Sequence, residues 1–399
     1  MKRGGGLYQG LKRMGTRRGV GGEQLSIRAG LLLYGEDLRV RKDSCIWIRE
    51  GIVESVETSS TCDRRSIGGP SIIVVPQPSN SHVHSADHAF TEYGLEMGLE
   101  ELVSYPKGLK HRLLEKARPE DLVRAIRDYY LLAWRYGLGA VSDFREGGGQ
   151  GCILAKKAAV TIPEGTNIVV LGRPGPLWPS RCDGLGVSSP LDYSIEELVR
   201  EASRFDITAA HIAESEEARR KGDLELAMEA GIRIAVHGIF LDYSDLLAMK
   251  EKSMGLVACV RSNMWHGAGI PPIRDIIETD VSLGLGTDNA SWNTPDIWEE
   301  ARAFLLAGRY QGVKEEKLVS KTLSALFIEG YKMLGLKPRI LKEGEPSRLL
   351  MVADMGAGLL NSVNPRAAII KRTGAGNIVA RIDDGKVTCL SKIAPTNMC

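Results

Sequence analysis

Short apolar runs of β-type residues alternate with amphipathic helical patterns from about Ser71 to Gly335. This alternation is typical of a parallel sheet whose strands are joined by helices. Eight runs qualify as strands: SIIVVP, GAVSDF, NIVVLG, GLGVSS, ITAAHIA, IRIAVH, LVACVR and SLGLGTD. Eight β/α units in roughly 250 residues fit a closed (β/α)8 barrel of the TIM type. The alternative is an open doubly wound sheet, but no G-x-G-x-x-G turn follows the first strand. We therefore predict an α/β protein with a barrel over residues 70–335.

The two ends of the chain have a different pattern. Residues 23–69 and 336–399 contain short β-type runs separated by glycines and charged turns. Strand-rich ends that flank a helix-bearing middle predict one small β-sandwich domain assembled from both termini. Residues 1–22 are glycine-rich and basic, with too few apolar positions to pack, and are predicted to form a disordered tail.

Composition limits the partners and the compartment. The formal net charge is +2 over 399 residues, which gives no reason to expect a nucleic-acid or membrane partner. No apolar stretch approaches the ~20 residues that cross a bilayer. The seven cysteines are scattered, odd in number and without a C-x-x-C pair. This pattern predicts a cytoplasmic protein without a disulfide framework and argues against cysteine as a metal ligand.

Side chains that can bind a metal follow several of the predicted strands. His82 and His84 come at the end of the first, and histidines at i and i+2 of a strand point to the same face. His211 ends the fifth strand, His237 the sixth and Asp288 the eighth. A barrel gathers these strand ends at one face, so the groups are predicted to converge on a cation. The alternative for an isolated H-x-H is a strand cap beside a surface residue.

Five short motifs stand in a specific order along the chain: Asn80-Ser81-His82-Val83-His84, His211-Ile212-Ala213-Glu214, Val236-His237-Gly238, Arg261-Ser262-Asn263 and Gly286-Thr287-Asp288-Asn289. With these motifs the sequence resembles the amidohydrolase superfamily of metal-dependent barrel hydrolases. Within it, the sequence resembles the branch of cytosine, guanine and S-adenosylhomocysteine deaminases and triazine chlorohydrolases. The likeness covers most of the chain, including the barrel and the split sandwich.

The resemblance implies a mononuclear site whose metal is held by four residues: His82, His84, His211 and Asp288. Binuclear relatives usually need a carboxylated lysine at the end of strand three or four, where this sequence has none. Lys156 and Lys157 lie upstream, in a predicted helix. One divalent ion is therefore predicted, and zinc suits the nitrogen and oxygen ligands, with iron(II) or manganese(II) as alternatives.

The predicted chemistry is hydrolysis by water that the metal activates, because the ion lowers the pKa of that water toward ~7. Asp288 can accept the proton of this water, and His237 can orient the attacking oxygen. Glu214, three residues after His211, can carry a proton to a ring nitrogen of the substrate. The alternative role for Glu214 is a carboxylate that stabilises a helix N-terminus.

Five further residues are candidates for substrate contact. Arg145 follows the second strand and Arg173 the third, and each could hold a carboxylate or phosphate or brace a loop instead. His111 resembles a lid residue in the long segment after strand one. The alternative is that it is a histidine on the surface of a helix. Asn263 and Trp265 follow the seventh strand. An aromatic ring there could stack on a flat heterocycle or close the barrel top.

Together these features predict a metal-dependent hydrolase of non-peptide carbon–nitrogen bonds that deaminates a cyclic amidine such as a purine, pyrimidine or pterin-like compound. One alternative is a chlorohydrolase or cyclic amide hydrolase with the same site. The other is a catalytically inactive, amidohydrolase-like binding protein, which typically loses metal ligands that this chain keeps. The expected partner is a small heterocyclic substrate, with no nucleic acid and no membrane, and a homo-oligomer is left open.

Overall fold

The computed structural model describes residues 16–17, 24–104, 107–174 and 180–391. The described residues fall into two compact units. One unit spans residues 78–338, and the other combines the described residues up to 77 with those from 339 onward.

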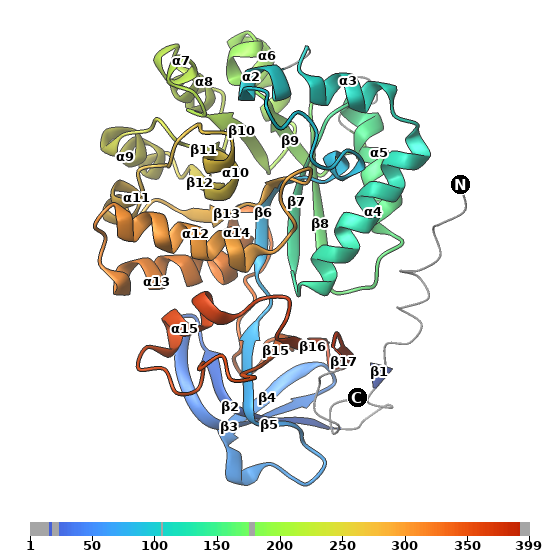
Figure 1. Ribbon diagram of the computed structural model, residues 1–399, viewed down its shortest axis with the longest axis vertical. Helices are drawn as coiled ribbons and strands as arrows, with labels where there is room; N and C mark the ends of the chain where they lie inside the picture. Colours follow the sequence, from blue (N-terminus) through green and yellow to red (C-terminus); the bar gives the residue numbers. More distant parts are fainter. Residues whose placement is uncertain (1–15, 18–23, 105–106, 175–179, 392–399) are drawn as a thin grey trace. The chain divides into compact units, whose positions relative to one another are not determined.

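The larger unit contains a parallel sheet that closes on itself. Its strands, in the order in which they pair, are β13 (Leu283–Leu285), β12 (Gly255–Ala258), β11 (Ile234–His237), β10 (Thr208–Ile212), β9 (Gly184–Val187), β8 (Asn167–Gly172), β7 (Ala140–Arg145), β6 (Ser79–His84) and β14 (Asp288–Asn289). Every pairing in this sheet is parallel. The edge strands β13 and β14 are separated in the chain by Gly286 and Thr287 alone. The sheet therefore curls into a TIM-like barrel (Figure 1).

Helices connect the strands and lie outside them (Figure 1). In chain order, the helical segments of this unit are η2 (Ser85–Ala89), α2 (Leu99–Val103), α3 (Leu109–Lys116), α4 (Pro119–Arg135), α5 (Gly148–Ala159), η3 (Pro190–Asp192), α6 (Ile195–Ala202), α7 (Glu216–Arg220), α8 (Asp223–Glu229), α9 (Tyr243–Glu251), α10 (Val260–Trp265), α11 (Ile273–Thr279), α12 (Ile297–Tyr310), α13 (Glu315–Ser324), η4 (Ala325–Glu329) and α14 (Gly330–Met333). The sequence specifies several starts, such as the capping box between Ser194 and Glu197 before α6. Within the described part of the chain, no helix is long and apolar enough to cross a membrane.

The first barrel strand is not the one that the hydropathy pattern indicated. The run SIIVVP lies in β5 (Ile67–Pro76), which pairs with β2 and β15 in the smaller unit. The barrel begins instead with β6, after residue 77 rather than at residue 70. β6 is polar in sequence yet buried throughout, because Asn80 bonds Thr287 through both halves of its amide group. The other seven predicted runs each overlap a strand of the barrel.

The smaller unit contains one mixed sheet built from both ends of the chain. Its strands, in pairing order, are β1 (Thr16–Arg17), β17 (Lys386–Cys389), β16 (Ile378–Asp383), β15 (Arg348–Ala353), β5, β2 (Leu25–Tyr34), β3 (Arg39–Arg49) and β4 (Ile52–Thr58). The short segments η1 (Ser59–Thr61) and α15 (Pro365–Arg372) accompany it. The expected two-sheet sandwich is not confirmed, because β5 joins the N-terminal and C-terminal strands into one continuous sheet. Of the predicted tail, residues 1–22, all but Thr16–Arg17 lie outside the described residues.

Two disulfide bonds between described residues correct the prediction made from the cysteines. Cys45 is bonded to Cys62 in the smaller unit, and Cys152 is bonded to Cys182 in the barrel. The sequence pattern missed them because the partners are 17 and 30 residues apart and only the fold brings their Cα atoms to 5.4 Å. The inference of a reducing compartment, which rested on unpaired cysteines, loses that support.

We expect reduction of these disulfides to lower the thermal stability of the protein. Closing loops of this length restricts the unfolded chain and stabilises the fold by about 3 to 4 kcal/mol for each bond. Differential scanning calorimetry with and without a thiol reductant measures the effect. The double variants Cys45→Ala/Cys62→Ala and Cys152→Ala/Cys182→Ala assign it to each unit. The same melting temperature in oxidised and reduced protein would contradict the expectation.

Candidate active site

Three histidines and an aspartate meet at the C-terminal ends of the barrel strands. His82 and His84 lie on β6, His211 lies on β10, and Asp288 lies on β14, which pairs with β6. The ligand atoms of the three histidines lie within 4.8 Å of one another. The Oδ1 atom of Asp288 lies 3.2 Å from Nε2 of His82 and 3.6 Å from Nε2 of His84. The fold therefore brings together the four side chains that the sequence predicted as metal ligands.

The nitrogen atoms of this cluster have the lone pairs that a cation needs. Nδ1 of His82 and Nε2 of His211 are buried and lack a hydrogen-bond partner among the described residues, and Nε2 of His82 faces the Asp288 carboxylate at 3.2 Å. Burial lowers the pKa of His82, lowers that of His84 to about 3, and lowers that of His211 well below its usual range. The rings are consequently neutral at pH 7. Buried polar atoms without partners are costly, so the donor set fits a resident divalent metal ion.

The carboxylate of Asp288 is held in its ionised form. Burial alone would raise its pKa, but the contact with His82 and the electrostatic influence of the neighbouring histidines hold that pKa well below its usual range. The Oδ2 atom accepts a hydrogen bond of 2.5 Å from the hydroxyl of Ser262. This bond fixes the carboxylate plane and leaves Oδ1 toward the histidines.

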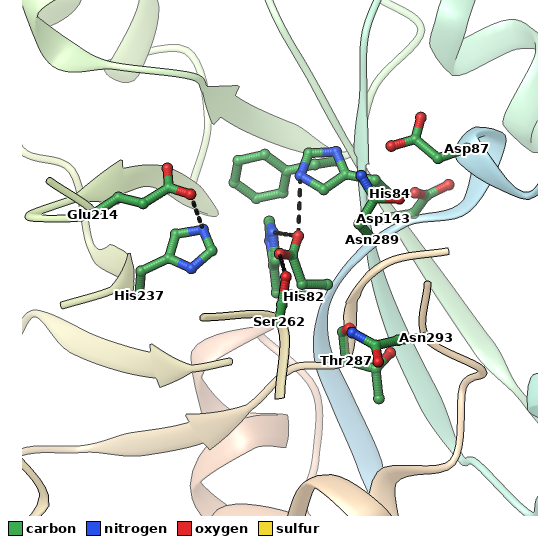
Figure 2. Close-up of polar contacts among 12 residues, drawn as sticks. His82, His84, Asp87, Asp143, Glu214, His237, Ser262, Thr287, Asn289 and Asn293 are labelled. Atoms are coloured by element: carbon green, nitrogen blue, oxygen red, sulfur yellow. Dashed lines mark hydrogen bonds and ion pairs between the residues drawn. The ribbon is translucent and has the colours of Figure 1, made fainter. Parts of the chain in front are cut away.

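Glu214 and His237 face each other beside this cluster (Figure 2). The Oε1 atom of Glu214 lies 3.7 Å from Nε2 of His237, and the Glu214 side chain keeps 27% of its surface exposed. The Nδ1 atom of His237 lies 2.9 Å from Oδ1 of Asn263. Because an amide oxygen only accepts, this contact places the proton on Nδ1. The Nε2 atom of His237 is thereby directed at the carboxylate of Glu214.

The backbone is strained at three residues of the site. Ala213, His237 and Asp288 have φ angles of 49°, 76° and 59°, in the left-handed region that residues other than glycine rarely adopt. Ala213 directly follows β10, His237 ends β11 and Asp288 begins β14. Surrounding bonds hold the strain in place, such as the 2.7 Å bond from the Ala213 amide to Asp223. Strain of this kind gathers at functional sites, which agrees with the placement of the polar cluster.

A cavity of about 450 Å³ opens over the cluster. This volume is in the range of small-molecule sites. Five residues already described line it: His84, His211, Glu214, His237 and Asp288. Beyond the cluster it is lined by residues that include Lys110, Arg173, Ser188, His266 and Trp292. Acid, base and aromatic groups therefore surround one space.

Two of the five predicted substrate contacts are corrected by their hydrogen bonds. Of the five, Arg173 is the one that lines the cavity. Arg145 is buried away from it, and its guanidinium pairs with Asp143 and Glu146. Asn263 is buried and engaged with His237. Both residues hold other side chains in place, as buried polar groups do when neighbouring elements supply their partners.

The other two predicted contacts are also not among the residues that line the cavity. Trp265 ends α10 with 59% of its surface exposed. The ring of His111 is turned toward the backbone, and its Nε2 lies 3.0 Å from the carbonyl oxygen of Val103. Position after a strand indicated proximity to the barrel mouth for these residues, but it does not determine the direction of a side chain.

Lys110 is a cavity residue that sequence analysis missed. Its ammonium group is buried, 2.9 Å from Oδ2 of Asp87 and 2.8 Å from Oε1 of Glu146. Burial alone would lower the pKa of Lys110, but these two carboxylates outweigh burial and raise it. In the sequence, Lys110 is one of several basic residues of an amphipathic helix. Nothing in the neighbouring residues indicates that Lys110, and not His111, faces the cavity.

Glu146 links this lysine to the metal-ligand cluster, since its Oε1 also lies 3.1 Å from Nδ1 of His84. A carboxylate on the far nitrogen of a histidine orients the ring and makes it a better ligand. We expect Glu146→Gln to weaken metal affinity by about 10- to 100-fold. Competition with a chromophoric chelator measures this affinity.

The matched control is Glu201→Gln. The Glu201 side chain is 10% exposed, as that of Glu146 is, but it pairs with Arg200 on α6 and with Arg204 just after this helix. Unchanged affinity in the Glu146 variant, or equal losses in both variants, would contradict the proposed link.

Comparisons with known proteins agree with this geometry. The sequence model described as "Amidohydrolase family" matches residues 194–388. A protein of Methanothermobacter thermautotrophicus with the provisional name aminohydrolase is 28% identical over 396 residues, which cover 91% of this chain and 98% of the relative. An uncharacterized protein of Methanocaldococcus jannaschii is 30% identical over 293 residues, which cover 67% of this chain and 76% of the relative.

A third relative is a 5-methylthioadenosine/S-adenosylhomocysteine deaminase of Pyrococcus horikoshii. It is 33% identical over 223 residues, which cover 52% of this chain and 53% of the relative. Among solved structures, a zinc-bound adenosine deaminase from Xanthomonas campestris superposes with a TM-score of 0.73 at 15% identity, covering 93% of this chain and 94% of that one. At this identity the superposition shows a common fold. On the combined evidence of motifs, barrel and relatives, the chain belongs to the amidohydrolase family.

Proposed function

We propose that this amidohydrolase-family hydrolase is a metal-dependent deaminase, which replaces an amino group on a cyclic amidine with oxygen from water. The observation that carries the proposal is the cluster of buried histidines beside the carboxylates of Asp288 and Glu214, in which Nδ1 of His82 and Nε2 of His211 lack a hydrogen-bond partner among the described residues. The relatives named aminohydrolase and deaminase support removal of an amino group. The cavity of about 450 Å³ suits a purine, pyrimidine or pterin-like compound.

In this proposal His82, His84, His211 and Asp288 hold one divalent metal ion. Zinc suits the nitrogen and oxygen donors, and iron(II) or manganese(II) would accept the same set. When bound, such an ion lowers the pKa of a water molecule toward ~7 and so supplies a nucleophile at neutral pH.

The chain's own residues move the protons. Asp288 is suited to accept one, because Ser262 fixes its Oδ2 while Oδ1 stays directed at the histidines. Glu214 is suited to deliver a proton to the ring nitrogen next to the attacked carbon, since its carboxylate is partly exposed at the cavity. Protonation makes that carbon a better electrophile, and such general acid–base help accelerates reactions by about 10²- to 10⁴-fold. His237, whose Nε2 lies 3.7 Å from Oε1 of Glu214, is suited to orient the attacking water.

The remaining cavity residues are suited to hold the substrate. Lys110 and Arg173 offer N–H donors on one wall of the cavity, and Trp292 offers an aromatic face. Aromatic rings bind flat heterocycles through their π faces. These residues would determine which ring and which substituents the site accepts.

Metal analysis followed by a substrate screen tests this proposal. The purified protein is assayed for bound metal and then for ammonia release from purines, purine nucleosides, pyrimidines and pterins. Chloride release from chlorotriazines is measured in parallel, because a chlorohydrolase would use the same site. We expect one metal ion per chain and ammonia from at least one class. A metal-loaded protein that releases chloride, or that turns over none of these compounds, would contradict deamination.

A further inference from the structure

We propose that α10 is a positioning helix, which aims both Asp288 and His237, and that the buried carboxyl group of Glu300 in α12 holds this helix in place. The proposal rests on the proposed function, because the aim of these two groups matters only if they serve catalysis. Ser262, Asn263 and Glu300 are positioning residues in this scheme, since they act through other side chains.

Two neighbouring residues of α10 contact two different catalytic candidates. The hydroxyl of Ser262 donates to Oδ2 of Asp288 at 2.5 Å, and Oδ1 of Asn263 accepts from Nδ1 of His237 at 2.9 Å. Both residues are buried, so water does not readily replace these bonds. One short helix therefore sets the orientation of a carboxylate from β14 and of an imidazole from β11.

The start of α10 is held by a carboxyl group from another helix. Glu300 lies in the first turn of α12 and is fully buried. Its Oε1 accepts hydrogen bonds from the backbone N–H groups of Val260 at 2.5 Å and Arg261 at 3.3 Å. The first N–H groups of a helix have no partner within the helix itself. Glu300 supplies that partner and thereby fixes where α10 begins.

The protonation state of the buried Glu300 carboxyl group determines which substitution mimics it best. Burial raises the pKa of Glu300 to about 8, so the neutral acid predominates at pH 7. Glutamine is neutral, has the same length and keeps an acceptor oxygen. Leucine has a similar volume but cannot accept a hydrogen bond. Glu300→Leu would leave two buried N–H groups without their acceptor, which forces the start of α10 to shift.

The adjacent residue offers a matched control. The Oε2 atom of Glu299 lies 2.8 Å from a guanidinium nitrogen of Arg261, and these side chains are 44% and 23% exposed. Surface ion pairs of this kind contribute little to stability. Glu299 and Glu300 thus touch the same helix from consecutive positions, one through a side chain near solvent and the other through buried backbone.

The test combines kinetics with a spectroscopic measurement of the metal site. A misplacement of about 1 Å can cost 10²-fold in rate, so we expect Glu300→Leu to lower kcat by about this factor with KM little changed. Glu300→Gln is expected to retain most of kcat, and Glu299→Gln to match the wild type. In cobalt-substituted protein, the visible absorption spectrum reports the arrangement of the ligands, including Asp288. We expect this spectrum to change in Glu300→Leu and to stay the same in the other two variants.

Ser262→Ala keeps the proposal falsifiable if Glu300→Leu does not fold. This variant removes one hydroxyl and is expected to change both the cobalt spectrum and kcat in a protein that still folds. If Ser262→Ala, or a folded Glu300→Leu, keeps the spectrum and kcat of the wild type, the positioning role is wrong. Failure of the proposed function is distinguishable, because it would be seen in the wild type itself as an absence of bound metal or of turnover, and it would overturn this inference as well.

Discussion

Asp288→Asn is expected to lower turnover by about 10²- to 10⁴-fold, because asparagine cannot accept the proton that the reaction releases. The substitution preserves size and leaves an acceptor for the hydroxyl of Ser262, which bonds Asp288 at 2.5 Å. His237→Ala is expected to cause a comparable loss while the protein keeps its metal, since His237 is not one of the four proposed ligands. Steady-state kinetics on the substrate found in the screen, with metal analysis of each variant, measures both effects.

Asp296→Asn is the matched control for the first variant. Asp296 is also buried and lies eight positions further along the chain, where it caps α12. Asparagine caps a helix about as well as aspartate does, so near-normal turnover is expected. Retained turnover in both Asp288→Asn and His237→Ala would refute the roles assigned to these two residues.

Removal of the metal is expected to lower the melting temperature and abolish activity together. Without a cation, the cluster buries histidine nitrogens that lack partners among the described residues. A ligand that binds only the folded state stabilises it by about 4 kcal/mol when its concentration is 1,000 times its Kd. Differential scanning fluorimetry with chelator, and then with zinc added back, measures this stabilisation.

His211→Ala should abolish this response, because it removes a central ligand of the cluster. His111→Ala is the control, since the His111 ring is bonded to the backbone of Val103 and does not belong to the cluster. A His211→Ala protein that binds metal with normal affinity, or a wild type whose melting temperature ignores the chelator, would show that the cluster is not the metal site.

The barrel was predictable because parallel strands that are buried on both faces consist of nearly continuous runs of apolar residues. NIVVLG and IRIAVH are such runs, and they contain β8 and β11. The same rule failed at β6. This strand is buried although it is polar, because Asn80 finds its partner Thr287 207 residues away in the chain. The sequence around β6 does not indicate that partner. The apolar run just before β6 belongs to the core of the smaller unit instead.

The proposed metal ligands were predictable for a geometric reason. Parallel strands bring their C-terminal ends to one face, so histidines at several strand ends are gathered whatever the loops do. The substrate side of the cavity has no such rule. Arg145 and Arg173 both follow strands, yet one guanidinium is buried against Asp143 and the other lines the cavity. Side-chain direction there depends on partners from other loops, such as the contact of Lys110 with Glu146.

The disulfide bonds were also not predictable from the sequence. Spacing alone gave no reason to pair Cys152 with Cys182, which lie 30 residues apart. The pairing follows from the fold, because α5 carries Cys152 and lies beside β8, which ends shortly before Cys182. Contacts between residues distant in sequence are therefore the part of this protein that the sequence pattern could not supply.

The most direct test of the central claim is a crystal structure of the protein prepared with zinc, with anomalous scattering recorded at the zinc absorption edge. The account predicts one anomalous peak at about 2.0 to 2.2 Å from nitrogen atoms of His82, His84 and His211 and from a carboxylate oxygen of Asp288. A zinc peak elsewhere, or these four side chains without a peak in protein that contains one zinc ion per chain, would contradict it.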